Sequence, residues 1–397
     1  MKRVYIVTVL TCIAILGALI GCLKVLNLSA GKDHVKVGFI YDNDESTPYT
    51  YNFSLAKDAV EKKYGDKAEI LTRSNVLDDD MEEPLRELAD QGCDIIFFNG
   101  YSEEVRKLAS DYPNTQFCQT SYMDMSHQSV PQNYHTFKGE AYQGRYVSGV
   151  AAGLKIKQMI EEGIIPENQA IMGFVAAFPT SEVISGYTAF LLGARTMVPQ
   201  TTLRVRYTQT WSSYAQEKSA AQKLIDEGCV VISQHTDTIG PAIACEEAVQ
   251  DKPICFVGYN QSMSEVAPAT SLITSRICWE PYVLAAVDAV MKDKKIESVV
   301  TGHIHGTDVS AGFEKGWVEM TDLNQQIAAS GTQAVMDSVI KQFMTGKVDF
   351  VFKGDYNGVN PDDPSDTIYL KRGYIENENT SYPLFHYILS DIITIEE

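Results

Sequence analysis

The sequence predicts an α/β protein made of two doubly wound parallel-sheet lobes with a hinged cleft between them. From His34 onward, short β-branched and aromatic runs alternate with helical patterns across Gly and Pro turns, which is typical of parallel βαβ units. A long helical pattern over 139–160 interrupts this alternation, and a new apolar strand then restarts it at 170–176. A chain of 397 residues is long enough to bury two such cores.

The first lobe is expected over residues 34–155. Its predicted strands are short apolar runs, at 35–41, 94–98 and 116–118. Its predicted helices lie between and after them, at 53–64, 83–91 and 102–111. The run 94–98 lacks polar alternation, which indicates a strand that is buried on both faces.

The second lobe is expected over residues 156–270, and residues 271–397 are expected to form a hinge crossing and a C-terminal segment that packs on both lobes. Predicted strands follow the first one at 203–208, 229–233, 255–258 and 271–273, with helices at 181–194 and 215–227. The helical pattern over 139–160 carries small residues that predict close helix packing, namely Gly144, Ser148, Gly149, Ala152 and Gly153.

The first 21 residues have the pattern of an export signal. Lys2 and Arg3 precede an apolar run of about 17 residues that ends in Gly21-Cys22, and this order is typical of secretory signals. The cysteine at the boundary resembles the lipobox of bacterial lipoproteins. We therefore expect a lipid anchor on Cys22, a flexible tether over 22–33, and a protein held on the extracytoplasmic face of the cell membrane. The alternative is a transmembrane anchor, since the run is at the short limit for a span.

Composition excludes several function classes. A net charge of −19 argues against nucleic-acid binding, which needs a basic face. Six cysteines follow Cys22 without a C-x-x-C pair, so we expect buried free thiols and no cofactor. His303 and His305, with Asp308 nearby, could share a strand face as metal ligands, but no wider cluster appears and we expect no metal. No nucleophile elbow or Gly-rich phosphate loop is present, so the sequence does not predict an enzyme.

Ligands of open α/β sheets bind beyond the carboxyl ends of the strands, so the loops there are the candidate site. These loops lie at 42–52, 99–102, 120–124, 178–182, 210–214, 234–237, 259–263 and 276–282. Their aromatic rings suit a flat, mostly uncharged ligand, and their amides and carboxylates would orient it. The candidate ligand-binding residues are Tyr49, Tyr51, Asn52, Asn99, Tyr101, Phe178, Trp211, Gln234, His235, Thr236, Asp237, Tyr259, Asn260 and Trp279.

Four stretches, at 143–153, 171–195, 210–228 and 231–237, resemble the basic membrane protein (BMP)-type substrate-binding proteins of ABC importers. The resemblance implies a periplasmic-binding-protein-like fold and a purine ligand that is passed to the permease subunits of the importer. It also implies a purine base held between two aromatic rings. Tyr49 matches the first ring by motif position, with Tyr51 as the alternative, and Trp211 matches the second.

The chain departs from the nucleoside-binding members of that family at the positions that hold ribose. Their aspartate after the strand ending at Gly258 corresponds to Asn260, and their lysine after Thr-Ser corresponds to Arg276. Loss of these charges favours a free base, such as adenine, over a nucleoside, although both interpretations stay open. A ligand sensor for a membrane signalling partner is a further alternative.

Overall fold

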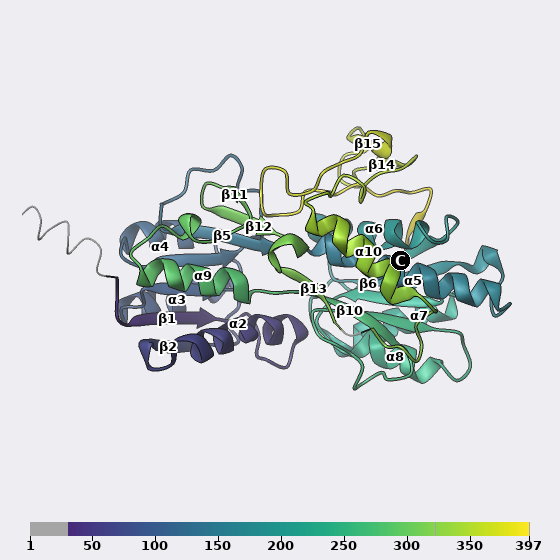
Figure 1. Ribbon diagram of the computed structural model, residues 1–397, viewed down its shortest axis with the longest axis horizontal. Helices are drawn as coiled ribbons and strands as arrows, with labels where there is room; N and C mark the ends of the chain where they lie inside the picture. The colour runs from purple at the N-terminus through teal and green to yellow at the C-terminus, as the bar shows by residue number, and fades with distance from the viewer. Residues whose placement is uncertain (1–30, 322, 397) are drawn as a thin grey trace, which may run out of the picture.

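The computed structural model describes residues 31–321 and 323–396, and it has two lobes side by side along the long axis (Figure 1). Each lobe contains a seven-stranded sheet, in the orders β11-β12-β5-β4-β3-β1-β2 and β13-β10-β9-β8-β6-β7-β16. The strands pair in parallel except where β11 meets β12 and β13 meets β10. The predicted α/β class with two parallel-sheet lobes is therefore confirmed.

The first lobe is built mainly from the N-terminal third of the chain. Its strands are β1 (Val35–Ile40), β2 (Ala68–Arg73), β3 (Ile95–Phe98), β4 (Gln116–Thr120), β5 (Tyr134–Gly139), β11 (His303–His305) and β12 (Asp308–Ala311). Its helices are α2 (Pro48–Tyr64), α3 (Glu82–Asp90), α4 (Val105–Asp111) and α9 (Glu280–Met291). Aromatic side chains fill the core between β1, β3, β5 and α9, where Phe137 and Tyr282 stack 3.9 Å apart.

The second lobe takes up most of the remaining chain. Its strands are β6 (Ile171–Ala176), β7 (Thr202–Tyr207), β8 (Val231–His235), β9 (Cys255–Tyr259), β10 (Ser271–Ile277), β13 (Val318–Met320) and β16 (Ile393–Glu396). Its helices are α5 (Ala141–Glu161), α6 (Ser181–Arg195), α7 (Tyr214–Asp226), α8 (Gly240–Ala248) and α10 (Thr332–Met344). A small hairpin of β14 (Asn357–Val359) and β15 (Thr367–Tyr369) completes the C-terminal region.

Helices α5 and α6 pack backbone to backbone, as the small residues of α5 predict. A Cβ atom on Gly149 would lie 1.9 Å from the carbonyl oxygen of Phe190, and one on Gly193 would lie 2.1 Å from that of Tyr146. Only glycine permits this approach. The packing assigns the whole of α5 to the second lobe, so the chain leaves the first lobe at 139–141, earlier than the expected boundary at residue 155.

The described chain passes between the sheets three times, after β5, after β10 and after β12. Side chains from both lobes meet beside the second crossing. The Nδ2 atom of Asn52 donates to the carbonyl oxygen of Ile277 at 2.6 Å, and Arg276 Nη1 donates to Asn52 Oδ1 at 3.2 Å. We call this region, where the crossings and these contacts join the two lobes, the hinge.

The structure also bears on the cysteines and on the membrane anchor. The cysteines of the described residues are buried free thiols, as expected. No helix among the described residues is long and apolar enough to cross a membrane. Cys22 and the predicted signal over 1–21 lie outside the described residues.

Candidate ligand-binding cleft

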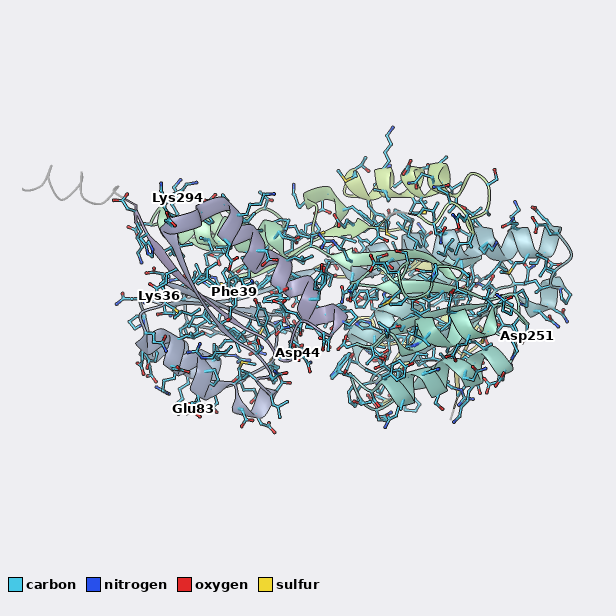
Figure 2. The ribbon with its side chains drawn as sticks, turned by 90° about the horizontal axis from the view of Figure 1, so that it is seen from below. Lys36, Phe39, Asp44, Glu83, Asp251 and Lys294 are labelled. Carbon is cyan, nitrogen blue, oxygen red and sulfur yellow. The ribbon has the colours of Figure 1, made fainter. Side chains whose placement is uncertain are left out.

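A cavity of about 190 Å³ lies between the lobes, at the carboxyl ends of their strands. Figure 2 shows this orientation: Asp44, in the loop after β1, lies on the side of the first lobe that faces the second, whereas Lys36 lies at the far end. The first lobe contributes Asp42, Asn43, Tyr49, Leu77, Asp78, Tyr122 and Lys138. The second lobe contributes Glu182, Trp211, His235, Asp237 and Tyr259. A larger hollow of about 960 Å³ lies beside β11 and β12, and the second lobe's sheet does not line it.

Half-buried aromatic rings from both lobes line the cavity, Tyr49 and Tyr122 from the first lobe and Trp211 from the second. Tyr49 lies in the first turn of α2 and meets Trp279 edge-on, with ring centroids 6.2 Å apart. Trp211 follows β7 and meets Phe178 edge-on at 5.5 Å. Because each ring is supported by another ring of its own lobe, its orientation is held before a ligand arrives. Tyr49 and Trp211 can therefore contribute stacking surfaces from opposite lobes.

The acidic side chains of the cavity differ in how far the protein satisfies them. Asp42 is well supported, because Thr50 Oγ1 and Asn99 Nδ2 donate to its Oδ1 atom at 2.9 and 2.8 Å. Burial nevertheless raises the pKa of Asp42 above its usual value. Asp237 has no protein donor to its carboxyl group within the described chain, and burial raises its pKa well above the usual range. Asp237 is thus the carboxyl group that is available to a ligand N–H or O–H.

Glu182 pairs with Lys138 across the cleft. The Nζ atom of Lys138, on β5 of the first lobe, lies 2.9 Å from Glu182 Oε2, at the start of α6 in the second lobe. Lys138 Nζ also donates to the carbonyl oxygen of Ser121 at 3.0 Å. With their side chains only 3% and 14% exposed, these two groups form an ion pair that is shielded from solvent. Breaking it would leave a buried charge without a partner.

His235 presents a neutral ring to the cavity. Burial, together with the nearby positive charges of Arg145 and Lys138, holds the pKa of His235 well below its usual value. Its Nε2 atom lies 3.9 Å from Glu182 Oε1, which is too far for a direct hydrogen bond. The guanidinium group of Arg145 lies 3.7 Å from the ring centroid of the cavity residue Tyr259 and donates to the carbonyl oxygen of Gln234. The arrangement suits a neutral ligand that forms hydrogen bonds.

The structure separates the fourteen sequence-predicted residues into three groups. The cavity wall includes Tyr49, Trp211, His235, Asp237 and Tyr259. A supporting layer behind the wall includes Asn99, Phe178, Gln234, Thr236 and Trp279. Tyr101 also belongs to the supporting layer, because its ring lies 5.9 Å from that of the cavity residue Tyr122. The remaining residues lie elsewhere, with Tyr51 toward solvent and Asn52 and Asn260 beside the hinge.

Seven cavity residues were not among the predicted candidates. Asp42, Tyr122 and Glu182 lie in loops that the strand-end rule did indicate, but nothing in their local sequence distinguishes them from their neighbours. Lys138 lies within a strand rather than after one. Its role depends on Glu182, which comes from the other lobe, so only the tertiary structure brings it into the site.

Residues 35–347 match the family model described as ABC transporter substrate-binding protein, PnrA-like. The chain belongs to this family. Its members are substrate-binding proteins rather than enzymes, and they work with ABC permease subunits on the extracytoplasmic side of the membrane. The family resemblance expected from the sequence is thus confirmed.

Two relatives differ in the ligand for which they are named. A purine-binding protein of Brucella abortus (strain 2308) is 30% identical over 265 residues, covering 66% of this chain and 70% of the relative. A protein of Haloferax volcanii named as an ABC transporter glucose-binding protein is 30% identical over 294 residues, covering 73% and 69%. Equal identity to both leaves the ligand of this chain to be argued from its own cleft.

Solved structures support the fold. A solute-binding protein of Aeropyrum pernix K1 superposes with a TM-score of 0.63 at 14% identity, covering 79% of this chain and 92% of the other. One from Conexibacter woesei DSM 14684 has a TM-score of 0.60 at 17% identity, covering 79% and 97%. At such identities the likeness concerns the fold alone, and it agrees with the expected periplasmic-binding-protein-like architecture.

Proposed function

We propose that this protein is a purine-nucleobase receptor of an ABC importer, anchored to the outer face of the membrane by a lipid on Cys22. The base would lie between Tyr49 and Trp211, and its binding would close the two lobes over the cleft. Closure presents a surface to the permease that depends on the ligand, because contacts from both lobes favour the closed form.

The observation that carries the proposal is a small cavity lined by half-buried aromatic rings from both lobes. About 190 Å³ is below the common range of about 300–1,000 Å³ for small-molecule sites, and this size suits a compact, flat ligand. Asp237 can accept an N–H of the base, and neutral His235 can hydrogen-bond without bringing a charge. These features favour a neutral heterocycle.

The positions that correspond to ribose contacts in nucleoside-binding relatives support a base over a nucleoside. Asn260 lies within 3.5 Å of Asn52, beside the hinge. Arg276 is bonded to Glu280 and Glu319. Neither residue lines the cavity, so neither is available to sugar hydroxyls in this conformation.

A ligand screen tests this proposal. The full chain would be titrated with adenine, guanine, hypoxanthine, adenosine and glucose while its thermal unfolding is followed, and gently denatured protein would be analysed by mass spectrometry for retained ligand. A base at a hundredfold excess over its Kd should add about 2.7 kcal/mol of stability. Stabilisation by glucose alone would refute the purine assignment, and a stronger effect of adenosine than of adenine would replace the base with the nucleoside.

The lipid anchor needs a separate test. Cys22→Ser would remove the acylation site while leaving the described residues unchanged. We expect wild-type protein to take up labelled fatty acid and to fractionate with membranes, and the variant to do neither. Membrane association of an unlabelled Cys22→Ser protein would favour the transmembrane alternative.

A further inference from the structure

A C-terminal segment, residues 376–385, contacts both lobes close to the ligand cavity. It lies outside the region matched by the family model, which ends at residue 347. Figure 1 shows the C-terminal region in yellow, extending from β14 and β15 over the second lobe toward β11 and β12 of the first. We call this segment the clamp.

Glu376 anchors the clamp to the second lobe. Its carboxylate is only 3% exposed, and it accepts hydrogen bonds from Ser185 Oγ on α6 at 2.6 Å and from the backbone of Leu384 at 2.7 Å. Phe385, which follows Leu384, is fully buried, and its ring stacks on that of Phe352 with centroids 4.6 Å apart. A buried carboxylate with several donors and a core ring make this anchor hard to break.

Asp308 on β12 holds the other side of the clamp to the first lobe. Its Oδ2 atom accepts from the Ser381 N–H at 2.7 Å and from Thr380 Oγ1 at 3.2 Å, while Thr136 Oγ1 of the first lobe donates to Oδ1 at 2.6 Å. These bonds are charge-assisted and buried, and the Met125 N–H of the first lobe adds a longer bond to Thr380 Oγ1 at 3.4 Å. This side of the clamp thus depends mainly on hydrogen bonds, whereas the Glu376 side adds the buried ring of Phe385. Opening of the lobes would therefore break this contact before the Glu376 anchor.

The clamp also contacts Lys138 of the ion pair across the cleft, and the residue that precedes Glu182. The Nζ atom of Lys138 lies 5.8 Å from the ring centroid of Tyr382, in the clamp, and 5.3 Å from that of Tyr122. Pro383 accepts a hydrogen bond from Ser181 Oγ at 2.7 Å, directly before Glu182. The clamp thus supports the cavity wall where Lys138 meets Glu182.

We propose that residues 376–385 stabilise the closed form of the protein and so raise its ligand affinity, with the Asp308 contact as the part that releases on opening. The proposal rests on lobe closure as the binding mechanism. Affinity follows because the apparent Kd equals the intrinsic Kd divided by the fraction of molecules that are closed. Replacing Asp308, which bonds the clamp but does not line the ligand cavity, would then change the affinity without removing a contact to the ligand.

The test compares Asp308→Ala with Glu378→Ala, which removes the same charge from an exposed position of the clamp itself. Adenine would be the probe, with Kd and dissociation rate from stopped-flow fluorescence and the radius of gyration from X-ray scattering. We expect Asp308→Ala to weaken binding about tenfold, mainly by faster dissociation, and to expand the ligand-free protein. At saturating adenine its radius of gyration should match that of the wild type, and Glu378→Ala should match it throughout.

Equal affinity and equal ligand-free dimensions for the two variants would overturn the clamp. If Asp308→Ala does not fold, Thr380→Val removes one hydroxyl donor to Asp308 while keeping the shape of the side chain, and we expect a smaller change in the same direction. If wild-type protein binds no purine, the proposed function fails, but the scattering of ligand-free protein still tests the clamp.

Discussion

The two tyrosines of the first turns of α2 provide a sharp test of the stacking site. Tyr49 lines the cavity, while Tyr51, two residues later, is 40% exposed on the outer side. Both follow Pro48 in a motif where either ring could have been the one that meets the ligand. The structure distinguishes them because successive helical positions point about 100° apart, so residues two apart lie on nearly opposite faces.

Replacing each tyrosine with leucine separates stacking from bulk. An aromatic ring that stacks on a base contributes about 1–3 kcal/mol, which at about 1.4 kcal/mol per tenfold corresponds to a loss of roughly fivefold to a hundredfold in affinity. Leucine keeps most of the packing on Trp279, so we expect Tyr49→Leu to fall in the lower half of that range. Tyr51→Leu should change the affinity less than twofold.

Isothermal titration calorimetry with adenine measures both affinities, and thermal unfolding of the ligand-free variants checks that each remains folded. The reasoning is refuted if Tyr49→Leu binds adenine as tightly as the wild type does. Equal losses in both variants would also refute it, because they would point to a general effect on α2 rather than to a ring at the ligand.

Two further variants test the carboxyl group of the cavity and the helix crossing. Asp237→Asn should weaken adenine binding yet stabilise the ligand-free protein at pH 7 by about 1 kcal/mol or more, since burial disfavours the ionised form of Asp237 and no protein donor among the described residues offsets that cost. Because the pKa of Asp237 is raised in the folded state, the wild-type protein becomes less stable as the pH rises from the unfolded-state pKa through the folded-state pKa. The gain in melting temperature of Asp237→Asn over the wild type should therefore be larger at pH 8 than at pH 5. A gain that does not change with pH would contradict the assignment. Gly149→Ala, whose Cβ atom would lie 1.9 Å from a backbone oxygen, should destabilise the fold by about 3 kcal/mol or more in urea unfolding. Gly186→Ala on α6, with its nearest atom at 3.6 Å, serves as its control, and similar losses in both would contradict close packing of α5 on α6.

The sequence by itself determined the α/β class, the two lobes and the family. These follow from local patterns: β-branched runs such as 94–98 are strands because they are buried on both faces, and the small residues of α5 indicate close packing because larger ones cannot fit. The strand-end rule also indicated most of the loops that line the cavity, since the carboxyl ends of parallel strands meet at one edge of a sheet, but it did not include the loop of Leu77 and Asp78.

Only the tertiary structure decided which residues in those loops share the cavity. Tyr49 and Tyr51 have the same side chain, and the direction of α2 distinguishes them. Lys138 lies inside a strand and meets Glu182 from the other lobe, and Asp308 meets Ser381 across 73 positions of the chain. Such pairs leave no local pattern, because their interaction depends on how two sheets and a C-terminal segment are placed in space rather than on the residues beside them.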